Sequence, residues 1–150
     1  MKYIYCIFSI VLFSKGCNDT ATTETTKSAQ DDISITYEAS SRGLYQKIEL
    51  TKAEIAVAND RSGHTTTKAC NETDWNEIIT LLDKIDSEKL NGTSIKEEDI
   101  ARDAAIPATL TIKYKDNTIT SKTFPHGNPP AYLAALLTKI QAMAKAIDKP

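Results

Sequence analysis

Five side chains in this 150-residue sequence have the chemistry of a nucleophilic thiol or an imidazole base. They are Cys6, Cys17, Cys70, His64 and His126. A thiol beside an imidazole can work as a nucleophile and its base, so Cys70 with either histidine would suffice if the fold brought them together. Their spacing along the chain gives no indication of such a contact. An enzyme that uses Cys70 or a histidine therefore stays an alternative interpretation.

No spacing typical of a metal, phosphate or acyl-transfer site accompanies these residues. The sequence has no HExxH or CxxC pair, no phosphate-binding glycine loop and no Gly-x-Ser-x-Gly elbow. We therefore expect a protein without catalytic residues, without a metal site and without a cofactor.

The residues before Cys17 have the layout of an export signal. A positively charged start is followed by the mostly apolar residues 3–13 and then by the small residues Ser14 and Gly16. A helix needs about twenty apolar residues to cross a bilayer, so this stretch is too short to remain as a span. We expect residues 1–16 to be removed as a signal peptide.

The boundary at Cys17 resembles the cleavage site of bacterial lipoproteins, with the looser cysteine box of the Bacteroidota. The resemblance implies that Cys17 becomes the first mature residue, carries diacylglycerol and is acylated on its amine. The expected location is then the cell envelope, with the lipid anchor in a membrane. Ordinary cleavage after Gly16 is the alternative, and it would release a soluble periplasmic or secreted protein in which Cys17 and Cys70 could pair.

The segment after the cysteine is polar. Residues 18–32 contain no apolar side chain larger than alanine, so residues 17–32 are expected to form the lipidated cysteine and a flexible tether. Removal of residues 1–16 takes away two lysines and no acid, which changes the formal net charge from −2 to −4. Because the chain is acidic and its three arginines are scattered, we expect no nucleic-acid partner.

Residues 33–150 are predicted to form one domain, and its first half alternates between apolar and polar residues as strands do. The alternating apolar positions are Ile33, Ile35 and Tyr37, then Leu44, Ile48 and Leu50. The segment Ser40–Gly43 between them has turn residues, and Gly43 is able to take a positive φ. Shorter strands are predicted at Ala53–Ala58 and Thr65–Ala69, on either side of an Asn59–Gly63 hairpin turn.

The middle of the chain carries two helix-start patterns. Asp74 with Glu77 forms a capping box, and Ser94 with Glu97 forms a second one that predicts a short helix through about Arg102. The apolar face after the first box is Trp75, Ile78, Ile79, Leu82 and Ile85. This face is expected to pack on a sheet.

The last third predicts two strands and a long helix. Ala108 to Lys115 alternates, a tight turn follows, and Thr118 to Phe124 is the returning strand. Asn128 is expected to cap the final helix, with two prolines in its first turn and Gly127 allowing the bend before it. The apolar stripe of that helix is Leu133, Leu136, Leu137, Ile140, Met143 and Ile147.

This order of elements indicates an α+β domain. We expect a mainly antiparallel sheet of about four to six strands, covered on one face by two main helices. Two exposed turns are candidate contact surfaces. One contains Arg42, Gly43, Leu44 and Tyr45, and the other contains His126.

The stretches "ITYEASSRGLYQKIEL" and "TLTIKYKDNTITSKTFPHGNPPAYLAALLTKI" resemble a group of small Bacteroidota lipoproteins of unknown function. The layout, an early glycine turn, a central helix, a strand pair and a terminal helix, is similar to that of emfourin, a small bacterial inhibitor of thermolysin-like metallopeptidases. These features predict a membrane-tethered, non-catalytic binding domain with an envelope protein as its partner. The emfourin-like layout implies the alternative of a peptidase inhibitor.

Overall fold

The structure is a computed structural model that describes residues 32–86, 90, 105–115 and 117–147. Its strands in chain order are β1 (Ser34–Ser40), β2 (Tyr45–Thr51), β3 (Glu54–Ala58), β4 (Thr66–Ala69), β5 (Pro107–Tyr114), β6 (Asn117–Thr120) and β7 (Phe124–Pro125). Its helices are α2 (Glu72–Leu82) and α5 (Ala131–Lys145).

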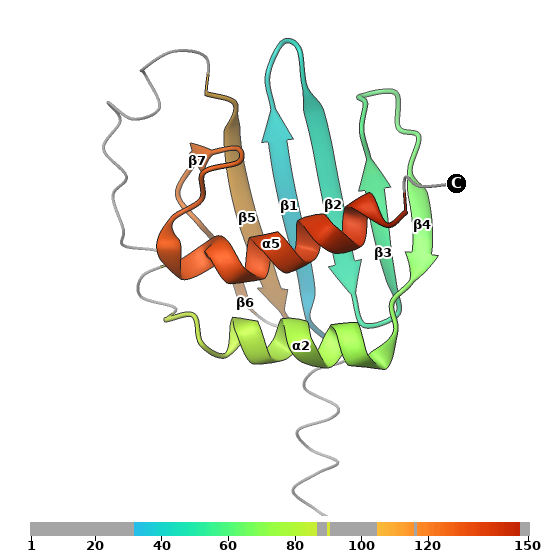
Figure 1. Ribbon diagram of the computed structural model, residues 1–150, viewed down its shortest axis with the longest axis vertical. Coiled ribbons are helices and arrows are strands. Elements are labelled where there is room, and N and C mark those ends of the chain that lie inside the picture. The colour runs from blue at the N-terminus through green and yellow to red at the C-terminus, as the bar shows by residue number, and fades with distance from the viewer. Residues whose placement is uncertain (1–31, 87–89, 91–104, 116, 148–150) are drawn as a thin grey trace, which may run out of the picture.

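The strands form one antiparallel sheet in the order β4-β3-β2-β1-β5-β6, and the short β7 also pairs with β5. Helices α2 and α5 lie on the same face of this sheet, and α5 crosses the strands near the middle (Figure 1). The predicted α+β class with a mainly antiparallel sheet and two covering helices is confirmed. The described residues form seven strands where about four to six were predicted, because the predicted strand Thr118–Phe124 is two strands, β6 and β7.

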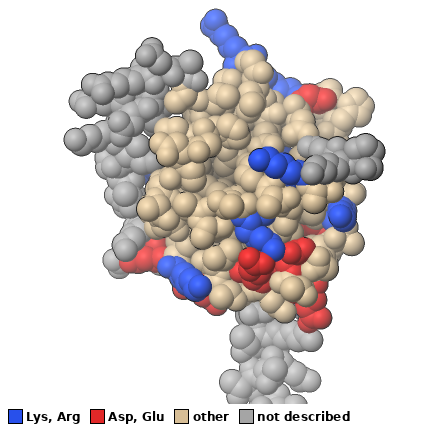
Figure 2. All heavy atoms as spheres, in the orientation of Figure 1, with Lys and Arg blue, Asp and Glu red and all other residues tan. Residues whose placement is uncertain are grey.

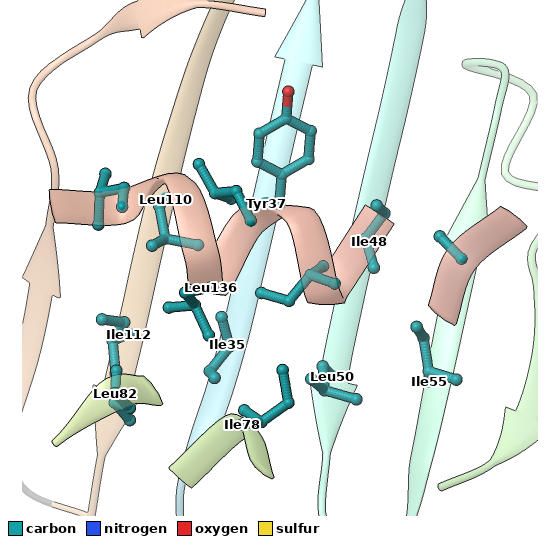
Figure 3. Close-up of a cluster of buried hydrophobic side chains, with 14 of the residues drawn as sticks. Ile35, Tyr37, Ile48, Leu50, Ile55, Ile78, Leu82, Leu110, Ile112 and Leu136 are labelled. Atoms are coloured by element: carbon teal, nitrogen blue, oxygen red, sulfur yellow. The ribbon is translucent and has the colours of Figure 1, made fainter. Parts of the chain in front are cut away.

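The core lies between the sheet and the two helices, and Figure 3 shows side chains of both layers meeting there. Alternate residues of the central strands point to the helices because successive side chains of a strand face opposite sides. The sheet contributes Ile35, Tyr37, Ile48, Leu50, Ile55, Val57, Leu110 and Ile112. The helices contribute Trp75, Ile78, Ile79, Leu82, Leu133, Leu136, Leu137, Ile140 and Ala144. The predicted apolar faces of both helices are therefore the buried ones.

The N-cap of helix α2 lies three residues before the predicted cap, Asp74. Asn71 is the N-cap, and its side-chain oxygen accepts a hydrogen bond of 2.8 Å from the backbone N–H of Asp74. Asp74 thus lies in the first turn, where its negative charge is favourable near the helix N-terminus. It also binds Lys139 of α5 at 2.7 Å, and Glu77 binds the same ammonium at 2.5 Å, so this ion-pair cluster ties the two helices together.

The predicted strand Thr118–Phe124 is divided in two at Ser121. In β6, Thr120 pairs with Thr111, whereas in β7, Phe124 pairs with Ala108, so the β6–β7 side has one extra residue and forms a bulge. Ser121 is buried, and its hydroxyl accepts a hydrogen bond of 2.9 Å from the backbone N–H of Leu110. The extra residue reverses which side chains face the helices.

Helix α5 does not begin with the predicted Asn128 cap. Pro130 is its N-cap residue and makes no side-chain capping bond. The backbone N–H of Asn128 instead bonds to the carbonyl of Pro125 at 3.0 Å and closes a tight turn. Gly127 has φ +83° at the third position of this turn, a conformation that favours glycine. The expected bend at Gly127 is thereby confirmed.

Several predictions concern parts of the chain outside the described residues. They are the signal peptide, Cys17, nearly all of the tether, and the short helix between Ser94 and Arg102. Within the described ranges, neither helix has the length and hydropathy needed to cross a bilayer.

Candidate functional site

A cleft of about 470 Å³ lies on the helix side of the sheet, between α5, the turn after β7, and the strands β1 and β2. Its polar lining is Tyr37, Gln46, His126, Thr138, Gln141 and Lys145. Its apolar lining is Phe124, Gly127, Pro129, Leu137 and Ala142. The volume falls within the range of about 300–1,000 Å³ that small-molecule sites occupy.

Tyr37 and His126 form the polar centre of the cleft. The Tyr37 hydroxyl lies 2.5 Å from His126 Nδ1, and the two rings are tilted with their centroids 6.1 Å apart. Figure 3 shows the Tyr37 ring passing α5, with its oxygen directed away from the apolar cluster. Burial raises the pKa of Tyr37 to about 12, although a hydrogen bond with Gln141 acts in the opposite direction. The phenol is therefore protonated near neutral pH and can donate its proton to Nδ1 of the neutral imidazole.

Two glutamine amides extend this network along the cleft. Gln141 of α5 donates a hydrogen bond of 2.9 Å from Nε2 to Oε1 of Gln46 on β2. Both glutamines lie at positions that face the space between sheet and helix. Because Gln141 also bonds to Tyr37, amide, phenol and imidazole form one connected chain of polar groups.

The bulge at Ser121 and the turn at Gly127 explain why His126 reaches Tyr37. If the chain continued in the register of β6, its even-numbered residues would face away from the helices. The extra residue reverses this, so that Phe124 points into the core and His126 lies on the same side of the sheet as Phe124. The backbone N–H of His126 bonds to the carbonyl of Ile106 at 2.7 Å, which holds the residue against β5. The imidazole is thus fixed by backbone geometry as well as by its own hydrogen bond.

The other predicted contact turn lies at the tip of the β1–β2 hairpin. Arg42 and Gly43 are exposed, and Leu44 is half-buried against the core. Tyr45 lies at a strand position that faces away from the helices, with the Arg61 guanidinium 5.3 Å from its ring centroid. His126 lines the cleft and the four tip residues do not, so the structure does not bring the five predicted contact residues into one site.

Gly43 does not use the positive φ that is open to a glycine. Among the described residues, positive φ values occur at Gly63 and Gly127. The turn is instead closed by a 2.7 Å bond from the backbone N–H of Ser41 to the carbonyl of Leu44. Arg61 adds bonds of 2.8 Å to the Ser40 hydroxyl and 2.5 Å to the Ser41 carbonyl, so a neighbouring loop holds the tip in place.

A second, smaller hollow of about 170 Å³ lies on the opposite side of the sheet, beside Tyr45 and Arg61. Its lining includes both signs of charge, and Lys47 and Glu49 already pair with each other at 2.7 Å. It is below the usual size of a ligand site. The cleft beside α5 is the stronger candidate.

The remaining candidate nucleophile and base lie apart from the cleft lining. Cys70 is a half-buried free thiol, and its pKa is raised by burial and by the nearby Asp74 carboxylate. His64 bonds through Nδ1 to Ser62 Oγ at 2.6 Å, and Asp60 bonds to that same hydroxyl. In a catalytic triad the imidazole stands between the hydroxyl and the acid, so this exposed turn has a different arrangement.

Among the described residues, no group of three or more His, Cys, Asp or Glu side chains could hold a metal ion. Comparison with protein-family models, with curated proteins and with solved structures found no match to this chain.

Proposed function

We propose that this protein is a lipid-anchored binding protein of the bacterial cell envelope and that the cleft beside α5 is its recognition site. The observation that carries the proposal is the Tyr37–His126 pair, which is held 2.5 Å apart inside a cleft of about 470 Å³. The polar groups of the cleft hold one another in fixed orientations. Such preorganisation lowers the entropic cost of binding a ligand.

The sequence supports the anchor. Cys17 follows an export signal, and the polar tether of residues 17–32 would span about 50 Å when fully extended. A domain on such a tether can meet soluble or surface-bound ligands while it stays attached to the membrane. Replacement of Cys17 by Ser should release the protein from membranes or block its maturation. Unchanged membrane fractionation together with an unchanged mature mass would contradict lipid attachment.

The recognition site can be tested in cells without knowledge of the ligand. We would place a photo-crosslinking amino acid at Thr138, an exposed α5 residue that lines the cleft. The matched control is Thr118, an exposed β6 residue whose strand position faces away from the helices. Discrete adducts are expected from Thr138 and not from Thr118. Adducts from Thr118 alone would move the recognition surface to the other face of the sheet.

A second candidate function, inhibition of thermolysin-like metallopeptidases, is favoured by one observation. The hairpin tip is exposed yet held by Arg61 through two hydrogen bonds, and an inhibitor needs such a preordered contact loop. The test is to titrate the protein against thermolysin-like enzymes of the same organism, beside a variant with both Arg42→Ala and Tyr45→Ala. Absence of inhibition by the parent protein would remove this candidate, and inhibition that survives the double change would place the contact elsewhere.

The third alternative, an enzyme that uses Cys70 or a histidine, has less support. A thiolate is the reactive form of cysteine, and the raised pKa of Cys70 lowers its population near neutral pH. His126 shares its Nδ1 with Tyr37, and His64 shares its Nδ1 with Ser62. If a thiol-directed alkylating agent abolished a hydrolytic activity of the purified protein, the enzyme interpretation would regain priority.

A further inference from the structure

The charge of the cleft differs from that of the chain as a whole. The sequence has 20 acidic residues and a formal net charge of −2, but none of the described residues that line the cleft is acidic. The lining does include Lys145, and it includes the imidazole of His126. Figure 2 shows this face of the molecule, where acidic side chains gather below, over α2, beside the ion pairs that tie α2 to α5. The electrostatic environment of the cleft therefore favours a negatively charged group.

The cleft presents several hydrogen-bond donors. In the tautomer in which His126 Nδ1 accepts the hydrogen of the Tyr37 phenol, the ring carries a hydrogen on Nε2. Gln46 accepts through Oε1 from Gln141, which leaves its own amide nitrogen as a donor. Within the described part of the chain, no further hydrogen bond occupies His126 Nε2 or Gln46 Nε2. With the Lys145 ammonium, these groups match a ligand atom that accepts hydrogen bonds.

The rest of the cleft lining is largely apolar and includes an aromatic ring. Phe124 lies with its ring centroid 6.3 Å from that of Tyr37, and Leu137 and Pro129 continue this surface. A ligand that fills the cleft must therefore bring an apolar body as well as an acceptor. A phosphate group, which carries about two negative charges, is a poorer match than a carboxylate, because the lysine among the described lining residues, Lys145, supplies one positive charge.

From these features we infer that the cleft binds an organic carboxylate with an apolar body, which is either a free acid or the C-terminal carboxylate of a peptide. The carboxylate accepts hydrogen bonds from His126 and Gln46 and pairs with Lys145, while the apolar body packs on Phe124 and Leu137. This inference rests on the proposed role of the cleft as a recognition site and adds the chemical class of the ligand.

Nuclear magnetic resonance titrations of the full-length protein test the inference. The probes are phenylpropionate, its uncharged amide and the corresponding amine, which share one apolar body. We expect phenylpropionate to shift resonances of Tyr37, His126 and Gln141. Loss of a hydrogen bond to a charged group costs about 1.5–3 kcal/mol, so the amide should bind about ten- to a hundredfold more weakly. The amine should bind most weakly of the three.

Two variants and a second pair of probes sharpen the test. Lys145→Gln should weaken the binding of phenylpropionate and leave the affinity for the amide unchanged. The matched control is Lys113→Gln, at an exposed β5 position that faces away from the helices. It should change neither affinity. Alanyl-phenylalanine with a free or an amidated C-terminus distinguishes the two sources. Tighter binding of the free dipeptide than of phenylpropionate identifies a peptide C-terminus, and the reverse order identifies a free acid.

The outcomes separate this inference from the proposed function. Equal affinities for acid, amide and amine at the cleft would overturn the carboxylate assignment and keep the cleft as a binding site. Absence of any shift at the cleft residues with saturating acid would also overturn it, and crosslinking from Thr138 would then decide the proposed function independently. If Lys145→Gln and Lys113→Gln weakened the binding of the acid equally, the effect would come from the net charge of the protein and not from a contact with Lys145. This result would also overturn the assignment.

Discussion

The buried phenol of Tyr37 predicts that the fold loses stability at alkaline pH. The phenol of Tyr37 is 2% exposed, and its pKa is raised from 10.0 to about 12 because burial disfavours the charged phenolate. Above pH 10 the unfolded chain loses this proton while the folded chain keeps it, so the unfolded state binds fewer protons. The free energy of unfolding must then fall as the pH rises from 10 towards 12.

The size of this loss follows from the shift. Each unit of pKa difference corresponds to about 1.4 kcal/mol, so Tyr37 alone should remove on the order of 2–3 kcal/mol of stability across this interval. Tyr37→Phe removes the titrating group and should remove that part of the pH dependence. At neutral pH the same change should cost about 0.5–1.5 kcal/mol, because it deletes a hydrogen bond to His126.

Urea unfolding of the parent and of Tyr37→Phe, measured at several values between neutral pH and pH 12, gives both quantities. Tyr114→Phe is the comparison: burial raises the pKa of Tyr114 as well, so this change should also remove part of the alkaline loss although Tyr114 lies outside the cleft lining. The reasoning would be refuted if the parent and Tyr37→Phe lost the same stability above pH 10. It would also be refuted if Tyr37 titrated at its ordinary pKa in the ultraviolet absorbance of phenolate.

Three further substitutions test the local structure by urea unfolding. Ser121→Ala should cost about 1–3 kcal/mol, because it leaves the buried N–H of Leu110 without its hydrogen-bond partner. An unchanged free energy of unfolding would argue against the bulge at Ser121. Asn71→Ala should cost about 1 kcal/mol as the loss of a helix cap, whereas Asn128→Ala should change stability by less than about 0.5 kcal/mol because Asn128 caps no helix. Lys139→Met should cost about 0–1 kcal/mol because the ion pairs of Lys139 with α2 are partly exposed. Added salt should reduce the difference in unfolding free energy between variant and parent. A larger loss that does not depend on salt would indicate that Lys139 stabilises the fold by packing.

The fold class was predictable because the spacing of apolar residues and the residue types at turns and caps indicate the same strands and helices over most of the domain. Alternation around Ile35 and Ile48 and the helical spacing from Trp75 identify which side chains are buried, and those side chains form the core of the structure. The helix starts were predicted less well. Asn71 and Asp74 are both good caps, and the choice between them depends on where the preceding strand ends, which local spacing does not determine.

The candidate site was only partly predictable. The sequence predicts His126 as a contact residue, but its partner Tyr37 lies 89 positions away and is recognisable only as an apolar position of an alternating strand. The sequence does contain a signal for the cleft, because Gln46 and Gln141 are polar residues at inward-facing positions of a strand and a helix. The bulge at Ser121 has no comparable signal, since a single extra residue changes the facing of His126 without changing the strand pattern.

The most direct test of the cleft as the recognition site is to block it and measure crosslinking from Thr138 in cells. Ala142→Phe adds a large side chain to the cleft lining without removing a side-chain hydrogen bond, and Ala135→Phe makes the same change at an exposed α5 position outside the lining. We expect Ala142→Phe to abolish the Thr138 adducts and Ala135→Phe to leave them at the parental yield. Equal adduct yields from the two variants would contradict the assignment of the cleft as the binding site.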